Sequence, residues 1–166
     1  MAEPAAAPRD ASALFRSSEG AITGTVVCAA AIAAGAGHID TTGQLSLVIL
    51  GTVAVYWIAH LHAETVGSSL THGHHPLTAI RHAFWETLPI AGASVLPLGI
   101  LLLTTLFGAD LNTAAKTALF ATVALLAIYS YLAGARGGLD TTGRLASAAA
   151  GGMVGLLVVL LKVGLH

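Results

Sequence analysis

A short polar stretch between two hydrophobic segments holds most of the side chains that could carry chemistry. Residues 60–86 read HLHAETVGSSLTHGHHPLTAIRHAFWE and contain six of the eight histidines of the chain, together with two glutamates. Imidazole and carboxylate groups together suit divalent metals of intermediate softness, and they also suit proton relays. We therefore look for a functional site in this stretch.

Two pairs of residues in this stretch have the same spacing. His60 and Glu64 are four residues apart, as are His82 and Glu86, and a threonine follows each glutamate. Residues with this spacing share one face of a helix. If the two helix ends pack together, they supply four ligands, enough for a transition-metal site completed by water. The alternative interpretation is two solvated helix ends at a membrane interface, where polar side chains lie beside Trp and Tyr.

Further candidate ligands lie between and before these pairs. His72, His74 and His75 form a short tract of the kind that sequesters metals, although it has no cysteine and no zinc-site spacing. A flexible, weakly binding loop is the plainer interpretation of this tract. Glu19 opens the first hydrophobic segment and could complete a site with the two downstream glutamates. Its plainer role is to stabilise a helix N-terminus.

The rest of the chain is almost entirely apolar. Of its 166 residues, 55% are hydrophobic and 9% are charged, and the mean hydropathy is +0.82, whereas about a quarter of the residues of a soluble domain are charged. The net charge of -1 offers no basic face for nucleic acid. Five segments are long and apolar enough to cross a bilayer as helices, which takes roughly 17–25 residues. They lie near Ala21–Gly37, Leu45–Ala63, Leu88–Phe107, Lys116–Gly134 and Leu145–Leu165.

We therefore predict an all-α polytopic protein of the cell membrane with five transmembrane helices. Residues 1–13 are predicted to be a disordered tail, and residues 64–87 a histidine-rich loop within a five-helix domain over 14–166. No P-loop, nucleophile elbow or dinucleotide pattern occurs, so we expect neither an enzyme nor an organic cofactor. A cleaved signal peptide is the alternative interpretation of the first segment, but Glu19 directly beside the apolar run argues against it.

The basic residues predict the orientation in the membrane. With five spans, most of them fall on the side that also holds the N-terminus and the histidine-rich loop, and positive charge marks the cytoplasmic side. Lys116 and Lys162 fall on the other side, near the ends of their spans. The N-terminus is therefore predicted to be cytoplasmic. The residues on the cytoplasmic side are Arg9, Arg16, Arg81, Arg136 and Arg144.

Small residues at close-packing spacing occur in the first and last segments. Gly20 with Gly24, and Gly151 with Gly155, are four residues apart, a spacing that lets helix backbones approach closely in lipid. These glycines are our candidate helix-packing residues. Pro97 lies within the third segment, where its missing N–H is expected to free a carbonyl and kink the helix.

One loop phrase occurs twice. It reads IDTTGQL over residues 39–45 and LDTTGRL over residues 139–145. The plainer explanation is local, because Asp, Thr and Gly all favour turns and helix starts. The sharper explanation is an inverted repeat of a helical hairpin, as in many transporters. The sequence leaves both explanations open.

Several short phrases fall in the order found in one family of membrane carriers. An acidic-glycine phrase opens the first span, a glutamate ends the second, and a characteristic run leads into a proline-bearing third span. With the glycines near the end, these phrases resemble the vacuolar iron transporter family, five-span carriers with a cytoplasmic metal-binding loop between spans two and three. The residues concerned are 18–24 (SEGAITG), Glu64, 76–80 (PLTAI), 96–98 (LPL), Gly134, 139–144 (LDTTGR), Gly151 and Gly152.

The resemblance implies a homodimer in the bilayer that exchanges a divalent metal for protons. It carries ligand positions over to Glu19, His60, Glu64 and Glu86. The chain departs from the family in having Glu19 where an aspartate is usual, His60 roughly where a methionine stands, and a short histidine-rich loop in place of a long acidic one. More imidazoles and fewer carboxylates would favour zinc, nickel or cobalt over harder ions.

Three functions follow from these patterns. A divalent-metal carrier would move Fe, Mn, Zn, Co or Ni ions out of the cytoplasm, through capture by the loop histidines and transfer to the histidine–glutamate pairs. A non-transporting subunit or scaffold would use its small-residue faces to bind a partner membrane protein. A proton or ion pathway would rely on the histidines.

Overall fold

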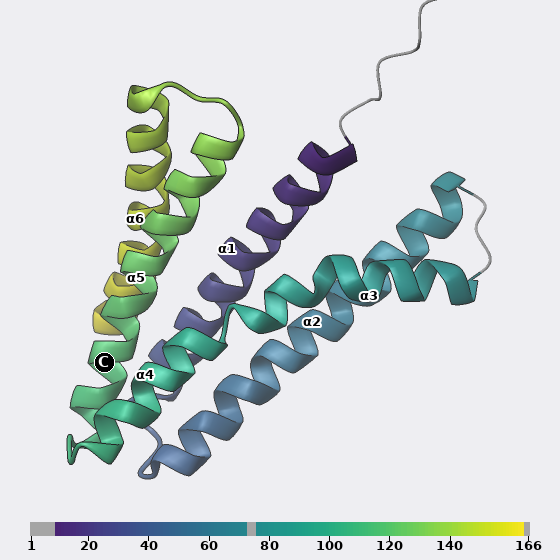
Figure 1. The fold of residues 1–166 in the computed structure, drawn as a ribbon. Coiled ribbons are helices and arrows are strands. Elements are labelled where there is room, and N and C mark those ends of the chain that lie inside the picture. Colours follow the sequence, from purple (N-terminus) through teal and green to yellow (C-terminus); the bar gives the residue numbers. More distant parts are fainter. Residues whose placement is uncertain (1–8, 73–75, 165–166) are drawn as a thin grey trace, which may run out of the picture.

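The chain folds into a bundle of long helices (Figure 1). The computed structural model describes residues 9–72 and 76–164, with side chains described over 19–69 and 80–164, and no strand occurs within these ranges. The prediction of an all-α fold is confirmed. The helices described are α1 (Arg9–Gly35), α2 (Thr42–His72), α3 (Pro76–Gly92), α4 (Val95–Leu106), α5 (Leu111–Arg136) and α6 (Thr141–Gly164).

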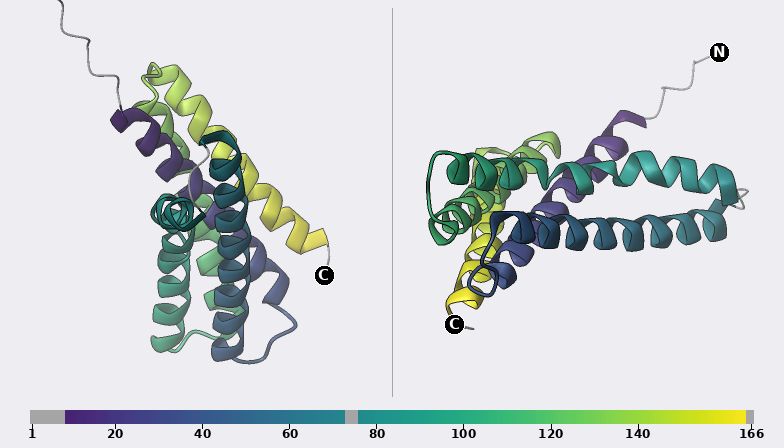
Figure 2. Two further views of the ribbon diagram at one scale, coloured as in Figure 1. Left: turned by 90° about the vertical axis from the view of Figure 1, so that its right-hand side faces the viewer. Right: turned by 90° about the horizontal axis from the view of Figure 1, so that it is seen from below.

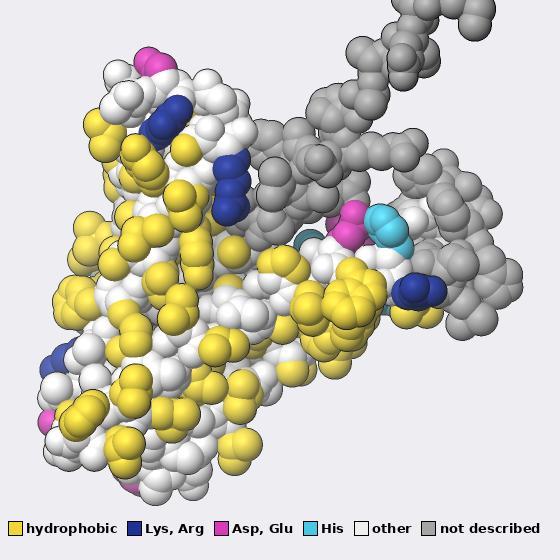
Figure 3. Space-filling model, in the orientation of Figure 1, with side chains coloured by type: hydrophobic (Ala, Val, Ile, Leu, Met, Phe, Trp, Pro, Cys, Tyr) yellow, Lys and Arg dark blue, Asp and Glu magenta, His cyan; other side chains and the backbone are white. Residues whose placement is uncertain are grey.

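Most of these helices have the length and composition of membrane spans. Within the described residues, four helical stretches are long and apolar enough to cross a membrane: Thr42–Ser69, Ile80–Leu106, Leu111–Arg136 and Thr141–Gly164. The apolar part of α1, Glu19–Gly35, is shorter. Apolar side chains cover much of the outer surface in the view of Figure 3. These features are consistent with a membrane protein, whose outer side chains face lipid rather than water.

Helix α1 lies inside the bundle and contacts the five other helices (Figure 2). Its sequence from Thr25 onward is rich in alanine, and small side chains let neighbouring helices approach closely. Cys28 and Ile32 of α1 are fully buried. They belong to a core that also contains Leu45 and Ile49 of α2, Leu101 of α4, and Ala115 and Leu119 of α5. The bundle is thus organised around α1.

The third span is broken into α3 and α4 at Ala93 and Ser94. Pro97 has no N–H to donate to the carbonyl of Ala93, one helical turn earlier, and this missing hydrogen bond favours a break at this point. Ser94 instead donates its backbone N–H to Ala91 O (3.3 Å). Pro97 itself lies in the first turn of α4, where a missing N–H costs little. The kink expected from Pro97 is therefore found one turn before it.

The helices extend further than the hydropathy of the sequence indicated. α2 continues through Glu64 to His72 and α3 already begins at Pro76, so much of the predicted loop 64–87 is helical. Hydropathy shows where a helix leaves the apolar layer, not where its hydrogen bonding stops. Within this polar part of α2, Thr65 and Ser69 donate their hydroxyls to the carbonyls of residues one turn back, so these side chains are satisfied inside the helix. Helix α1 also extends beyond its apolar run, because it begins at Arg9, within the predicted tail of residues 1–13.

The candidate helix-packing glycines all lie at contacts between helices of this chain. A Cβ at Gly24 would overlap Ile90 O of α3, and one at Gly20 would lie 3.2 Å from Ile90 Cγ1. A Cβ at Gly151 would overlap Ser130 Oγ of α5, and one at Gly155 would lie 3.0 Å from Val123 Cα. The small-residue faces are thus covered by α3 and α5.

Side chains in three connections cap the helices that follow. Thr41 Oγ1 accepts the backbone N–H of Gln44 (3.3 Å) before α2, and Asp140 Oδ1 accepts that of Gly143 (2.9 Å) before α6. At α5, hydrogen bonds from the hydroxyl and backbone N–H of Thr113 lower the pKa of the Asp110 carboxyl. The two copies of the DTTG phrase thus start helices, and they lie at opposite ends of the bundle (Figure 1).

Candidate functional site

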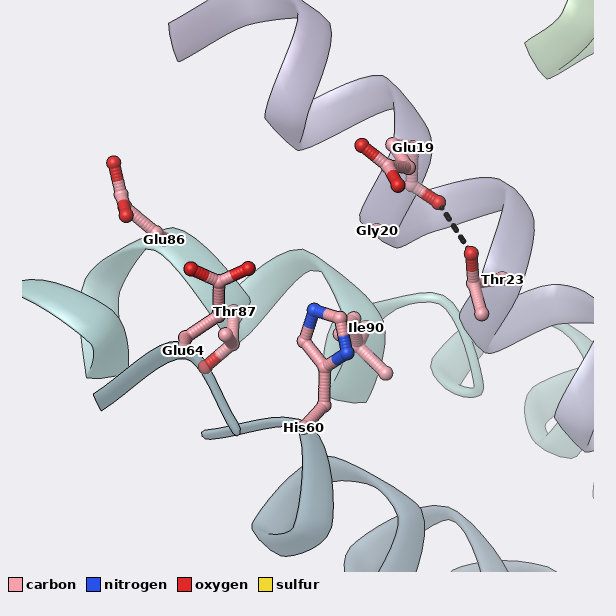
Figure 4. A pocket seen from close by; sticks show the side chains of 8 residues that line it. All are labelled: Glu19, Gly20, Thr23, His60, Glu64, Glu86, Thr87 and Ile90. Carbon is pink, nitrogen blue, oxygen red and sulfur yellow. Dashed lines mark hydrogen bonds between the residues drawn. The ribbon is translucent and has the colours of Figure 1, made fainter. Parts of the chain in front are cut away.

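A small pocket between α1, α2 and α3 brings together residues that are far apart in the sequence (Figure 4). Its volume of about 50 Å³ leaves room for an ion with a water molecule. Four of the predicted metal ligands are among its lining residues. The lining consists of Glu19, Gly20 and Thr23 of α1, His60 and Glu64 of α2, and Glu86, Thr87 and Ile90 of α3.

The close contact of α1 with α3 places Glu19 in the pocket. Because Gly20 and Gly24 have no side chains, the α1 backbone approaches α3 beside Ile90. Figure 4 shows the Glu19 carboxylate directed from α1 toward the side formed by α2 and α3. Thr23 lies one turn further along α1 and donates its hydroxyl to Glu19 O (2.9 Å). The close approach of α1 to α3 at Gly20 and Gly24 thus brings Glu19 to the pocket.

Helix α2 contributes His60 and Glu64, which lie one turn apart on the same face and point into the same space (Figure 4). The His60 ring stacks on Tyr56 one turn earlier, with ring centroids 6.2 Å apart and an interplanar angle of 18°. The four-residue spacing of His60 and Glu64 predicted that they share one face of a helix, and in α2 they do.

A hydrogen bond joins α2 to α3 beside the pocket. Trp57 Nε1 donates to Thr87 Oγ1 (3.0 Å), and Thr87 in turn donates to Ala83 O (2.8 Å). Thr87 is 1% exposed and lines the pocket. The ring of Phe84 meets that of Trp57 edge-on at 5.3 Å. Sequence analysis missed this role of Thr87, although the threonine that follows each glutamate was an available sign.

The lining is negatively charged when its carboxyl groups are ionised. It contains three glutamates and one histidine, and no lysine or arginine. Glu19 and Glu64 are exposed at the mouth, whereas Glu86 is half-buried. Carboxylates that converge on one cavity repel each other and attract a cation, and the attraction is stronger near low-dielectric protein walls than in water. The pocket is therefore suited to a small cation.

The predicted four-ligand set is only partly brought together. His82 does not line the pocket: its side chain is 68% exposed, and its Nδ1 lies 3.2 Å from Glu86 Oε2. Among the residues that the structure describes, no three His, Cys, Asp or Glu side chains are close enough to hold one metal ion. His72 ends α2, but its side chain is not described, and His74 and His75 lie outside the described residues. The four pocket ligands thus surround a space without closing on it.

Replacing Trp57 with phenylalanine is expected to lower the free energy of unfolding by about 1 kcal/mol, the usual net value of a hydrogen bond. The ring contact with Phe84 is retained, but Thr87 loses its donor. Thermal unfolding of the purified protein in detergent measures the effect. Trp85→Phe is the matched control, because Trp85 is 65% exposed. Equal effects of the two substitutions would contradict a special role of Trp57.

Comparisons with known proteins do not place this chain in a family: no family model, curated protein or solved structure matches it. The residues that line the pocket are therefore the remaining indication of what the protein can bind. Carboxylates and a neutral imidazole bind divalent metals, and they take up protons when the metal leaves. The pocket groups these side-chain types in one place, although no three of them in the described residues are close enough to hold an ion as they stand.

Proposed function

We propose that this protein is a membrane carrier that exchanges divalent transition-metal ions for protons. The observation that carries the proposal is the pocket, which Glu19, His60, Glu64 and Glu86 line from three helices of an otherwise apolar bundle. Ionisable side chains are rare between membrane helices, and those present usually mark a substrate or ion pathway. The open arrangement suits a transported substrate, which must be released as well as bound.

In this proposal α1 is the fifth membrane span. Its apolar part is short, but α1 packs against all the other helices and so needs less contact with lipid. The five spans then alternate in direction. The start of α1, the end of α2 and the α5–α6 connection lie toward one end of the bundle (Figure 1). Arg81, Arg136 and Arg144 belong to this end, so it is the proposed cytoplasmic end, and the pocket opens near it.

The composition of the pocket narrows the range of metal ions that we propose as substrates. Three carboxylates and one imidazole form a set richer in oxygen than the histidine count of the sequence suggested. His82 lies outside the pocket lining, as does the exposed His62. Oxygen-rich sets with one imidazole suit Mn²⁺, Fe²⁺, Co²⁺ and Zn²⁺, whereas soft Cu⁺ prefers sulfur ligands. We therefore propose Mn²⁺ and Fe²⁺ as the first ions to test.

The packing of the helices supports the scaffold hypothesis less well than the carrier proposal. It required open small-residue faces for a partner helix, but the faces of Gly24 and Gly151 are covered by α3 and α5 of the same chain. A partner helix would have to displace one of these helices. The carrier proposal needs no such rearrangement.

Transport can be measured with the purified full chain in lipid vesicles that contain a metal-sensitive dye. Fe²⁺, Mn²⁺, Co²⁺, Ni²⁺ and Zn²⁺ are offered in turn, with and without a proton gradient, and protein-free vesicles serve as the control. We expect metal entry that depends on protein and is accelerated by the gradient. If folded, reconstituted protein moves none of the five ions, the proposed function is wrong.

A further inference from the structure

We propose that His82 holds the Glu86 carboxylate away from the pocket until a cation draws it in. This inference rests on the proposed function and adds to it a residue that tunes the affinity of the site without being a ligand. His82 would be a positioning residue that competes with the transported ion for one carboxylate.

Glu86 contacts His82 and also belongs to the pocket lining. Glu86 lines the pocket, yet its Oε2 lies 3.2 Å from His82 Nδ1 on the solvent side of α3. In Figure 4 the Glu86 carboxylate points away from the space into which His60 and Glu64 are directed. The Glu86 side chain is 26% exposed, so part of it reaches the surface. In the proposal, this carboxylate leaves its position beside His82 for a second one in the pocket.

The relative strengths of these interactions allow the exchange. An exposed pair four residues apart on a helix is a weak interaction. The pairing needs no charge on the histidine, because a neutral imidazole with its proton on Nδ1 also donates to a carboxylate. A divalent ion between Glu19, His60 and Glu64 attracts a third carboxylate more strongly than an exposed imidazole does. Glu86 is therefore expected to leave His82 when the ion binds.

Binding of Mn²⁺ to the purified full chain, titrated at one fixed pH, tests the proposal. His82→Ala is expected to tighten binding about twofold, the gain from removing a weak helical pair. Glu86→Ala is expected to weaken binding about tenfold. In the Glu86→Ala background, His82→Ala should change nothing further, because the carboxylate for which it competes is absent. His62→Ala is the matched control, since His62 is exposed and does not line the pocket.

Weaker binding by His82→Ala would make His82 a ligand and overturn the proposal, as would unchanged binding. A metal-free measurement keeps this test separate from that of the proposed function. The ¹⁵N signals of the His82 ring should show the Nδ1–H tautomer in the wild-type protein and lose it in Glu86→Ala. Unchanged signals would refute the pairing alone. A wild-type protein that binds neither Mn²⁺ nor any of the other four ions would refute the proposed function, and with it the release of Glu86 by a cation.

Discussion

Glu64→Ala is expected to lower metal transport by about tenfold or more, which is at least the loss that follows when partners of a metal site are removed. Glu64 lies between the other lining groups, one turn from His60 on α2 and across the pocket from Glu19 (Figure 4). Its removal takes away an anionic oxygen ligand that no neighbouring side chain replaces. The initial rate of dye response in loaded vesicles measures the effect.

Two further variants separate the charge of Glu64 from its position. Glu64→Gln keeps the shape but removes the charge, and we expect nearly the same loss of transport. Asp40→Ala removes an exposed carboxylate at the opposite end of the bundle, in the α1–α2 connection, and should transport normally. Wild-type rates in Glu64→Ala would exclude the pocket as the site of transport, whereas wild-type rates in Glu64→Gln would exclude a role for its charge.

Gly24→Ala is expected to destabilise the protein by about 2 kcal/mol, the net of an overpacking cost near the upper end of the usual range and the gain in helix propensity. A Cβ at this position would overlap Ile90 O and lie 2.9 Å from Ala93 Cβ. Both belong to the neighbouring helix segment, so neither can yield by a change of rotamer. The higher helix propensity of alanine offsets only about 1 kcal/mol of the overpacking cost. Thermal unfolding in detergent gives the change in stability.

Gly51→Ala is the matched control for this substitution. Gly51 lies within α2, and nothing lies within 4 Å of a Cβ built on it. Its replacement should leave the stability unchanged or raise it slightly. Because α1 carries Glu19, the forced separation of α1 from α3 in Gly24→Ala should also weaken Mn²⁺ binding. A Gly24→Ala protein as stable as Gly51→Ala would contradict the close contact of α1 with α3.

Features that depend on neighbours along the chain could be predicted from the sequence. The apolar runs predicted helices of membrane-span length, because hydropathy over such a window reflects burial in lipid or protein. The spacing of His60 and Glu64 predicted one shared helical face, because the helical period is local. Pro97 predicted a freed carbonyl and a kink in the third span, and the structure has a break between α3 and α4 one turn earlier, at the carbonyl that proline leaves without a donor.

Features that depend on which helix faces meet appeared only in the tertiary structure. The two H-x-x-x-E pairs are equivalent in sequence, yet His60 lines the pocket and His82 faces solvent. Glu19 reaches the same space because Gly24 lets α1 approach Ile90. Helical periodicity places residues on a common face but does not say where that face points. The packing of α1 against α3 decides this, through contacts between residues more than sixty positions apart.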